Sequence, residues 1–280
     1  MCRLYGFISN EATKVECSLA YAQNAIMHQS RQDSAGIAHP DGWGIAWYED
    51  GLPRVERSIK SAYEDLWFST TAEKVYAQTI IAHVRRASVG KVRIENTHPF
   101  IHNVWTFAHN GTITGFEQLQ SQLRSEVSPP LAICREGTTD SELVFYWLLS
   151  RLQHMGQPLG EQCQDVDLVV HLMTRAIPEL ARRSDELSPE RPARLNIVLS
   201  DGRMLVAVRW NQTLYLAMRQ DVHDCEICGI PHIRHDASIP YRATVVASEK
   251  ITHEPWLELP NRSLLIANGS GDLRTISLVS

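Results

Sequence analysis

Short apolar segments bounded by turn-forming residues recur toward both ends of the chain. They lie at residues 44–48, 79–84, 104–108 and 195–199. Segments of this length and pattern are typical of β-strands with one or both faces buried. The pattern therefore predicts β-structure in both the first and the last part of the sequence.

Turn signals predict how some of these strands connect. Asp201-Gly202 separates the apolar run at 195–199 from a second run at 204–208. An Asp-Gly pair between two such runs is the strongest short-range indication of a β-hairpin. Residues 49–51 and 268–271, which are rich in Asp, Asn and Gly, predict two more hairpins. Hairpins at both ends imply antiparallel sheet.

The middle of the chain follows a helical period instead. Apolar residues recur at three-to-four spacing over 141–153 and 166–183, and more weakly over 116–127, which predicts helices that bury one face. Pro129-Pro130 ends the weakest of these, and the segment 188–192 separates the last helix from the C-terminal strands. Strands, then helices, then strands, without repeat or long linker, predict one α+β domain of stacked layers over residues 1–280.

Composition narrows the class of partner. The chain of 280 residues is 44% apolar and 21% charged, with a net charge of -5, as in ordinary folded soluble proteins. No basic stripe or polybasic cluster argues for a nucleic acid or a membrane, so we expect a small-molecule substrate. The N-terminus lacks the apolar stretch of a secretory signal, which favours the cytoplasm. A homo-oligomer is compatible with the sequence, which does not decide the oligomeric state.

Cys2 is the first residue with special chemistry. Removal of Met1 would place its thiol beside a free α-amine of the same residue, and we expect the mature chain to begin at Cys2. An α-amine titrates near neutral pH, at about 7.7 to 8.0, so it can accept the thiol proton and return it later. The alternative is that Cys2 is only an early residue of a buried strand. Cys2 alone does not decide between them.

Four further segments follow in order: 41–48 (Asp-Gly-Trp-Gly-Ile-Ala-Trp-Tyr), 82–88, 96–100 and 107–111 (Phe-Ala-His-Asn-Gly). With Met1-Cys2-Arg3 they resemble the class II glutamine amidotransferases. The small stand-alone members, such as the γ-glutamyl hydrolase of ergothioneine biosynthesis, are the most similar. Residues 245–249, 254–256 and 263–265 resemble the closing strands of that family. The resemblance implies a four-layer α/β/β/α sandwich of two antiparallel sheets, the N-terminal-nucleophile hydrolase fold.

The resemblance also implies an oxyanion hole. Attack of a thiolate on an amide creates a tetrahedral oxyanion that needs preorganised hydrogen-bond donors. By resemblance these are the Asn110 side chain and the backbone N–H of Gly111. Taken alone, Asn110-Gly111 would equally suit a hairpin turn.

Two further residues match the family's substrate clamp. Arg85 corresponds to the residue that holds the substrate carboxylate, for which a planar guanidinium is suited. Arg86 is its neighbour and should point to the opposite face. Relatives that make amino sugars or nucleotides carry tryptophan at the position of Arg86. This difference leaves open which molecule, if any, accepts the released ammonia. Asp140 corresponds to the residue that binds the substrate amine, although the segment 139–142 also suits a plain helix N-terminus.

The remaining segments have weaker assignments. Residues 41–44 suit a glycine-rich wall beside the nucleophile, or equally a tight turn into a strand with Trp43 and Trp47 in the core. An earlier segment, 33–38, imitates a motif of other family branches, but the hairpin after 41–48 favours the later one. His98 and Ser88 could line the pocket, or serve the core and turns.

A cysteine pair late in the chain is the last candidate for chemistry. Cys225 and Cys228 are spaced as in a zinc knuckle, and His232 and His235 follow closely, which predicts a structural zinc site on these four residues. The alternative is a polar loop with reduced thiols. The expected reaction itself requires no cofactor.

These residues together predict an amidohydrolase that cleaves the side-chain amide of glutamine or of a γ-glutamyl amide through a γ-glutamyl thioester on Cys2. Two alternatives stay open. The chain could be the glutaminase subunit that supplies ammonia to a separate synthetase, or a catalytically silent γ-glutamyl binding module.

Overall fold

The first strand organises the molecule. In the computed structural model, which describes residues 2–222, 224–233 and 239–278, strand β1 (Arg3–Lys14) is the longest strand. Leu4 and Ile8 point to one face of β1 and Tyr5 and Phe7 to the other, and all four side chains are buried. Both faces of β1 are therefore covered, which places its start deep inside the protein.

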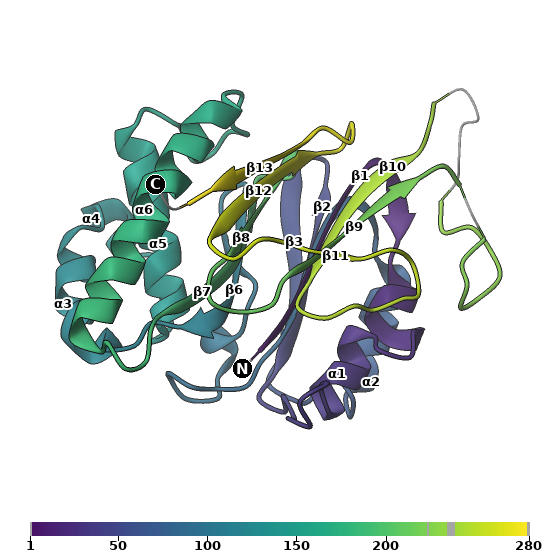
Figure 1. Cartoon of the computed structure of the whole chain (residues 1–280), viewed down its shortest axis with the longest axis horizontal. Coiled ribbons are helices and arrows are strands. Elements are labelled where there is room, and N and C mark those ends of the chain that lie inside the picture. The colour runs from purple at the N-terminus through teal and green to yellow at the C-terminus, as the bar shows by residue number, and fades with distance from the viewer. Residues whose placement is uncertain (1, 223, 234–238, 279–280) are drawn as a thin grey trace.

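Two antiparallel sheets form the centre of the fold (Figure 1). The first has the order β11-β9-β10-β1-β4-β2-β3, and the second the order β13-β12-β8-β7-β6-β5. In the first sheet, β1 is joined by β2 (Trp43–Glu49), β3 (Leu52–Ser58), β4 (Tyr76–Val84), β9 (Tyr215–Gln220), β10 (Arg242–Ala247) and β11 (Leu257–Glu258). The second contains β5 (Phe100–His102), β6 (Trp105–Thr112), β7 (Arg194–Ser200), β8 (Met204–Arg209), β12 (Ser263–Asn268) and β13 (Leu273–Ser277).

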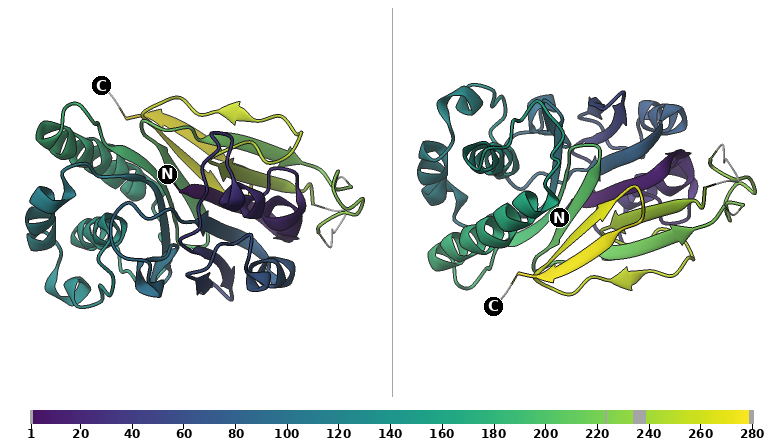
Figure 2. Two further views of the ribbon diagram at one scale, coloured as in Figure 1. Left: turned by 90° about the horizontal axis from the view of Figure 1, so that it is seen from below. Right: turned by 90° about the horizontal axis from the view of Figure 1, so that it is seen from above.

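Helices cover the outer face of each sheet, so that four layers result (Figure 2). The first sheet is covered by the π-helical turn η1 (Cys17–Tyr21), α1 (Ile26–Arg31) and α2 (Leu66–Lys74). The second is covered by α3 (Phe116–Ser125), α4 (Pro129–Ala132), α5 (Asp140–His154) and α6 (Val166–Leu187), and a short turn η2 (Ile94–Asn96) lies in the loop before β5. The predicted α+β sandwich of two antiparallel sheets is confirmed.

The hydrophobic core has three parts. One lies between the second sheet and α3 to α6, and another between the first sheet and η1, α1 and α2. The third lies between the sheets and is built largely from aliphatic side chains such as Leu4, Ala108, Val198 and Ala207. Small side chains let the two sheets pack closely, which brings the ends of β1 and β6 near each other.

The predicted hairpins are present. β2 and β3 are joined at Asp50 and Gly51, both with positive φ (51° and 78°), as a tight hairpin turn requires. Asp201-Gly202 joins β7 to β8, and the last predicted turn joins β12 to β13. Gly202 also has a steric reason to be glycine, because a Cβ there would lie 2.6 Å from the Tyr48 ring.

The structure adds helices that the sequence pattern did not predict. α1 spans only six residues, too few to show a helical period, and α2 begins with two exposed apolar residues, Leu66 and Trp67, which blur its apolar face. Pro129-Pro130 was predicted to end the preceding helix, and α3 ends before it at Ser125. The same two prolines begin α4, because proline is tolerated in the first helical turn. Among the described residues, no helix is long and apolar enough to cross a membrane.

Candidate active site

Cys2 lies at the start of β1, against the end of β4. Because Arg3 pairs with Val84 in the ladder between these strands, Cys2 lies beside the two arginines that follow β4. The backbone N–H of Arg86 donates to Cys2 Sγ at 3.4 Å, and Sγ lies 3.5 Å from the Arg86 carbonyl oxygen. The thiol is buried, and burial raises its pKa above the ordinary value although the Arg86 N–H and the Arg85 charge oppose this. Ionisation of Cys2 therefore needs a base.

Arg85 is buried and Arg86 is exposed, so the two point to opposite faces as predicted. The Arg85 guanidinium donates to the carbonyl oxygens of Val89 at 3.0 Å, Gly90 at 3.3 Å and Lys91 at 3.3 Å. Carbonyls fix the orientation of a guanidinium but do not neutralise its charge. Among the described residues, no carboxylate forms an ion pair with Arg85. Its position therefore suits a carboxylate brought by a ligand.

Asn110 and Gly111 lie within β6 and pair with Asn196 and Leu195 of β7. The interpretation of Asn110-Gly111 as a hairpin turn is therefore wrong, because tertiary pairing with β7 places both residues inside a strand. A side chain cannot be added at position 111, since its Cβ would lie 1.9 Å from the Arg194 carbonyl oxygen. Glycine is required here by crowding.

The Asn110 amide is held in a fixed orientation. Its Nδ2 donates to Ser248 Oγ at 2.9 Å, and its Oδ1 accepts from Gln212 Nε2 at 3.2 Å. Ser248 Oγ also accepts the backbone N–H of Leu4 at 3.0 Å. The strand that carries Cys2 and the strand that carries Asn110 are thus joined through one hydroxyl. One N–H of the Asn110 amide stays available for another acceptor.

Asp140 is the first residue of α5, and Thr139 is the N-cap. The Thr139 hydroxyl accepts from the backbone N–H of Glu142 at 3.2 Å, so the helix N-terminus interpretation is confirmed. Asp140 Oδ2 accepts from the backbone N–H of Ile113 at 3.1 Å, just beyond the end of β6. Burial has the largest effect on the pKa of both Cys2 and Arg85, and the Asp140 charge raises each pKa by a smaller amount.

A buried ion-pair network that the sequence interpretation missed lies behind Cys2. Arg3 donates to Glu249 Oε1 at 2.9 Å and to the Cys2 carbonyl oxygen at 3.0 Å, and it also pairs with Asp33. Burial raises the pKa of Asp33, but the backbone N–H of Ile37 and the Arg3 charge outweigh it and lower the pKa. The segment 33–38 is therefore an anchor for Arg3. The only sequence signal would have been a charge beside Cys2 in an otherwise apolar strand.

The segment 41–44 forms the predicted tight turn into a strand. Trp43 is fully buried at the start of β2, while Trp47 is partly buried, so the segment enters a strand as expected. Gly42, with a φ of 125°, accepts the backbone N–H of Arg85 at 2.7 Å. The turn thus supports Arg85, which precedes the Arg86 backbone that contacts Cys2.

His98 belongs to the core. Its ring lies 4.3 Å from the ring of His83, centroid to centroid, and both imidazoles are buried. Ser88 is exposed.

The predicted zinc residues are brought together in part. Cys225, Cys228 and His232 lie in one cluster, but its fourth member is Cys17. His235 lies outside the described residues.

Sequence comparisons identify the family. The sequence model of the glutamine amidotransferases class II matches residues 1–278. The chain belongs to the class II glutamine amidotransferases. Among curated relatives, an uncharacterised protein of Methanocaldococcus jannaschii is 37% identical over 95% of this chain and 69% of its own length. A probable glutamine amidotransferase of Saccharomyces cerevisiae is 28% identical over 95% and 81%. The γ-glutamyl-hercynylcysteine sulfoxide hydrolase of Mycolicibacterium smegmatis is 26% identical over 95% of both chains.

Solved structures of this family share the fold. A class II glutamine amidotransferase domain protein from Silicibacter pomeroyi superposes with a TM-score of 0.65 at 21% identity, over 100% of both chains. The glutamine phosphoribosylpyrophosphate amidotransferase of B. subtilis gives a TM-score of 0.62 at 17% identity, with 99% of this chain matching 49% of that one. The predicted family and its sandwich fold are both confirmed, and the chain is an enzyme of the amidotransferase and amidohydrolase kind.

Proposed function

We propose that this protein hydrolyses the side-chain amide of a γ-glutamyl compound, with Cys2 as the nucleophile. One observation carries the proposal. Hydrogen bonds link the separate segments that carry the predicted residues. Cys2 contacts the backbone of Arg86, next to Arg85, and Asn110 is joined through Ser248 to Leu4, two residues after Cys2. Asp140 accepts the backbone N–H of Ile113, two residues after Gly111. A thiol, a cation, an anion and aligned amide donors are the four groups that thiol-dependent cleavage of a glutamine-type amide requires.

The nucleophile is activated after removal of Met1. The α-amine of Cys2 accepts the thiol proton, which the raised pKa of the buried thiol makes necessary. Sγ then bonds to the amide carbon, and the C–N bond breaks as the α-ammonium returns the proton to the departing nitrogen. Water hydrolyses the resulting γ-glutamyl thioester and regenerates the thiol.

The oxyanion formed on the way is bound by the Asn110 amide and the Gly111 N–H. A hydrogen bond donated to Ser248 and one accepted from Gln212 fix the Asn110 amide, so no reorganisation is needed when charge develops. Donors preorganised in this way contribute the largest single part of the rate enhancement in many acyl transfers.

The substrate is oriented by its two charged ends. Arg85 binds the α-carboxylate and Asp140 binds the α-ammonium, which fixes the amide over Sγ. The γ-glutamyl half is thus specified, whereas the leaving amine is not. The names of two similar mycobacterial enzymes, γ-glutamyl-hercynylcysteine sulfoxide hydrolases, support a γ-glutamyl amide as a substrate class beside glutamine.

The test is release of glutamate from glutamine, glutathione and a series of γ-glutamyl amides. We expect hydrolysis of at least one γ-glutamyl amide, and Cys2→Ala should lower kcat by more than about a thousandfold while ligand binding persists. Cys134→Ala, at an exposed cysteine, is the matched control and should retain full activity. Glutamine turnover confined to mixtures with a synthetase would favour the ammonia-supplying subunit.

The mass of the intact protein tests whether the α-amine of Cys2 is free to act as the base. Active protein should lack Met1, whereas activity in protein that keeps Met1 would rule out the α-amine mechanism. Binding of γ-glutamyl compounds without turnover in processed protein would identify a silent binding module.

A further inference from the structure

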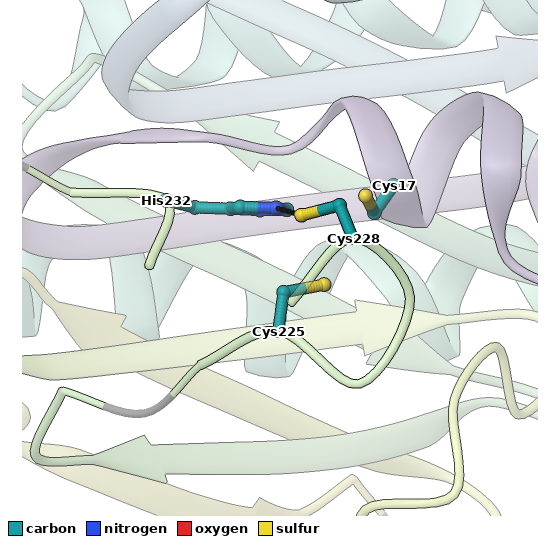
Figure 3. Close-up of side chains that lie close together, drawn as sticks. All are labelled: Cys17, Cys225, Cys228 and His232. Atoms are coloured by element: carbon teal, nitrogen blue, oxygen red, sulfur yellow. Dashed lines mark hydrogen bonds between the residues drawn. The ribbon is translucent and has the colours of Figure 1, made fainter. Parts of the chain in front are cut away.

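A cluster of three thiols and an imidazole lies far from Cys2. Figure 3 shows Cys225, Cys228 and His232 from the loop after β9 converging on Cys17, which lies on η1 directly after β1. Their four ligand atoms all lie within 4.8 Å of one another. Cys2 precedes β1 and Cys17 follows it. The ends of β1, Arg3 and Lys14, lie opposite Val84 and Tyr76 of β4, and the length of β4 between these two residues puts the cluster roughly 26 Å from the active site.

The cysteine pair has the local geometry of a metal knuckle. Gly229 has a φ of 73°, and its backbone N–H donates to the Cys225 carbonyl oxygen at 2.8 Å, which closes a tight turn. The backbone N–H of Ile227 donates to Cys225 Sγ at 3.4 Å. A backbone N–H directed at sulfur stabilises a thiolate, and thiolate is the form in which cysteine binds a metal.

His232 is oriented to offer one nitrogen. Its Nδ1 lies 3.0 Å from the Lys14 carbonyl oxygen, and a carbonyl can only accept, so Nδ1 carries the proton. Nε2 is therefore the unprotonated nitrogen, and it lies 3.1 Å from Cys228 Sγ. A backbone carbonyl that holds the distal N–H of a histidine in this way is the usual support of a metal ligand.

Cys17 is brought to the loop by β-pairing. The backbone N–H of Lys14 donates to the His232 carbonyl oxygen at 2.9 Å, and Thr13 forms an antiparallel bridge with Ile233. The end of β1 thus holds the loop in register, and the turn into η1 places Cys17 opposite the knuckle. Cys17, Cys225 and His232 also line a cavity of about 240 Å³.

We propose that Cys17, Cys225, Cys228 and His232 bind one structural zinc ion. Three sulfurs and one imidazole nitrogen in tetrahedral reach are a donor set that selects Zn²⁺, and four protein ligands leave no open position for catalysis. The ion would fasten the loop after β9 to the junction of β1 and η1. Cys17 thereby takes the position that the sequence pattern assigned to His235.

Metal analysis of the full-length protein, purified without chelators, tests the site. We expect about one zinc per chain, with all six cysteines reduced when the thiols are counted in denaturant. In Cys17→Ser, the zinc bound per chain should fall at least tenfold. Cys163→Ser, at another buried free cysteine, and His235→Ala should retain it. Metal-free protein with six free thiols, or a disulfide within the cluster, would overturn the proposal, and zinc retained in Cys17→Ser but lost in His235→Ala would return the fourth ligand to His235.

A second measurement covers the case in which Cys17→Ser fails to fold. Exchange of the metal in the unaltered protein for Co²⁺ should give visible bands of a tetrahedral ion and a near-ultraviolet sulfur-to-cobalt band with the intensity of three thiolates. An intensity of two thiolates would exclude Cys17. The kcat of the folded zinc-free protein should stay within about twofold of the zinc-bound form, because the cluster lies at the opposite end of β1 from Cys2.

Discussion

At the residue scale, several positions around Cys2 are set by contacts made in the folded state. Gly111 is the clearest, since a Cβ there would lie 1.9 Å from a backbone oxygen that cannot move aside without breaking the β6 and β7 ladder. Gly160, by contrast, has open space around its Cβ position. A glycine-to-alanine substitution can therefore be compared between a crowded position and an open one.

Gly111→Ala should lower the free energy of unfolding by about 1 to 3 kcal/mol through overpacking, and it should also lower kcat because the Gly111 N–H shifts. Urea denaturation and steady-state kinetics measure the two effects. Gly160→Ala is the control and should change neither. Unaltered kcat in a folded Gly111→Ala protein would contradict the oxyanion role.

Ser248 is expected to act as a positioning residue, because its hydroxyl holds both Leu4 and Asn110. Ser248→Ala should lower kcat by roughly tenfold with little change in KM, since a loosened Asn110 amide weakens only transition-state binding. Ser263→Ala is the matched control, because that buried hydroxyl, within the described part of the chain, bonds only to the Pro260 carbonyl. A rise in KM at constant kcat would show that Ser248 serves substrate binding instead.

At the element scale, the ends of elements carry the chemistry. β1 delivers Cys2, β4 delivers Arg85, β6 delivers Asn110, and α5 delivers Asp140 as its first residue. Residues at element ends combine a rigid support with exposed backbone donors, which suits a site that must bind charge. Of the two long helices that cover the second sheet, α5 and α6, only α5 begins at the site.

Substitutions at the N-caps of α5 and α6 can therefore distinguish an effect on substrate binding from an effect on stability alone. Thr139→Ala should lower the free energy of unfolding by about 1 kcal/mol and raise KM, because Asp140 loses its fixed orientation. Asp165→Ala removes the N-cap bond of α6 and should cost similar stability without a change in KM. Thr139→Ser should restore both values. Equal KM in the Thr139 and Asp165 variants would refute the role of the cap.

At the scale of the whole molecule, the space between the sheets contains buried histidines. The pKa of His83 falls to about 3 and that of His98 falls well below the usual value, in both cases because burial disfavours the imidazolium. In the unfolded chain these groups bind protons below about pH 6.5. The unfolded state then binds more protons than the folded state, so stability is full above that pH and is lost as the pH falls.

Acid titration of stability should reveal this. Between pH 6.5 and pH 4, each such histidine should remove up to about 1.4 kcal/mol of unfolding free energy per pH unit. His83→Leu should flatten the dependence by about one such contribution, because the His83 imidazole is fully buried. His171→Gln, at an exposed position on α6, should leave it unchanged. Equal slopes in the unaltered and His83→Leu proteins would contradict a neutral buried His83.

The sequence by itself predicted part of the strands, including β2, β4, β6, β7 and β8, the three longer helices and the hairpins, because those depend on local periodicity and turn residues. It did not predict β1 from the pattern. It also identified the family, because Cys2, Arg85, Asn110 and Asp140 stand in segments whose order and types can be recognised without contacts. It could not predict α1, which is too short to show a period, or the Arg3 network, whose partners Asp33 and Glu249 are distant in the chain.

Tertiary structure decided the rest, for a common physical reason. A strand pair sets which distant side chains meet, and no local pattern encodes that register. Pairing with β7 made Asn110-Gly111 part of a strand where the dipeptide alone suggested a turn. Pairing of Lys14 with His232 brought Cys17 to the late cysteine pair, where spacing along the chain had pointed to His235.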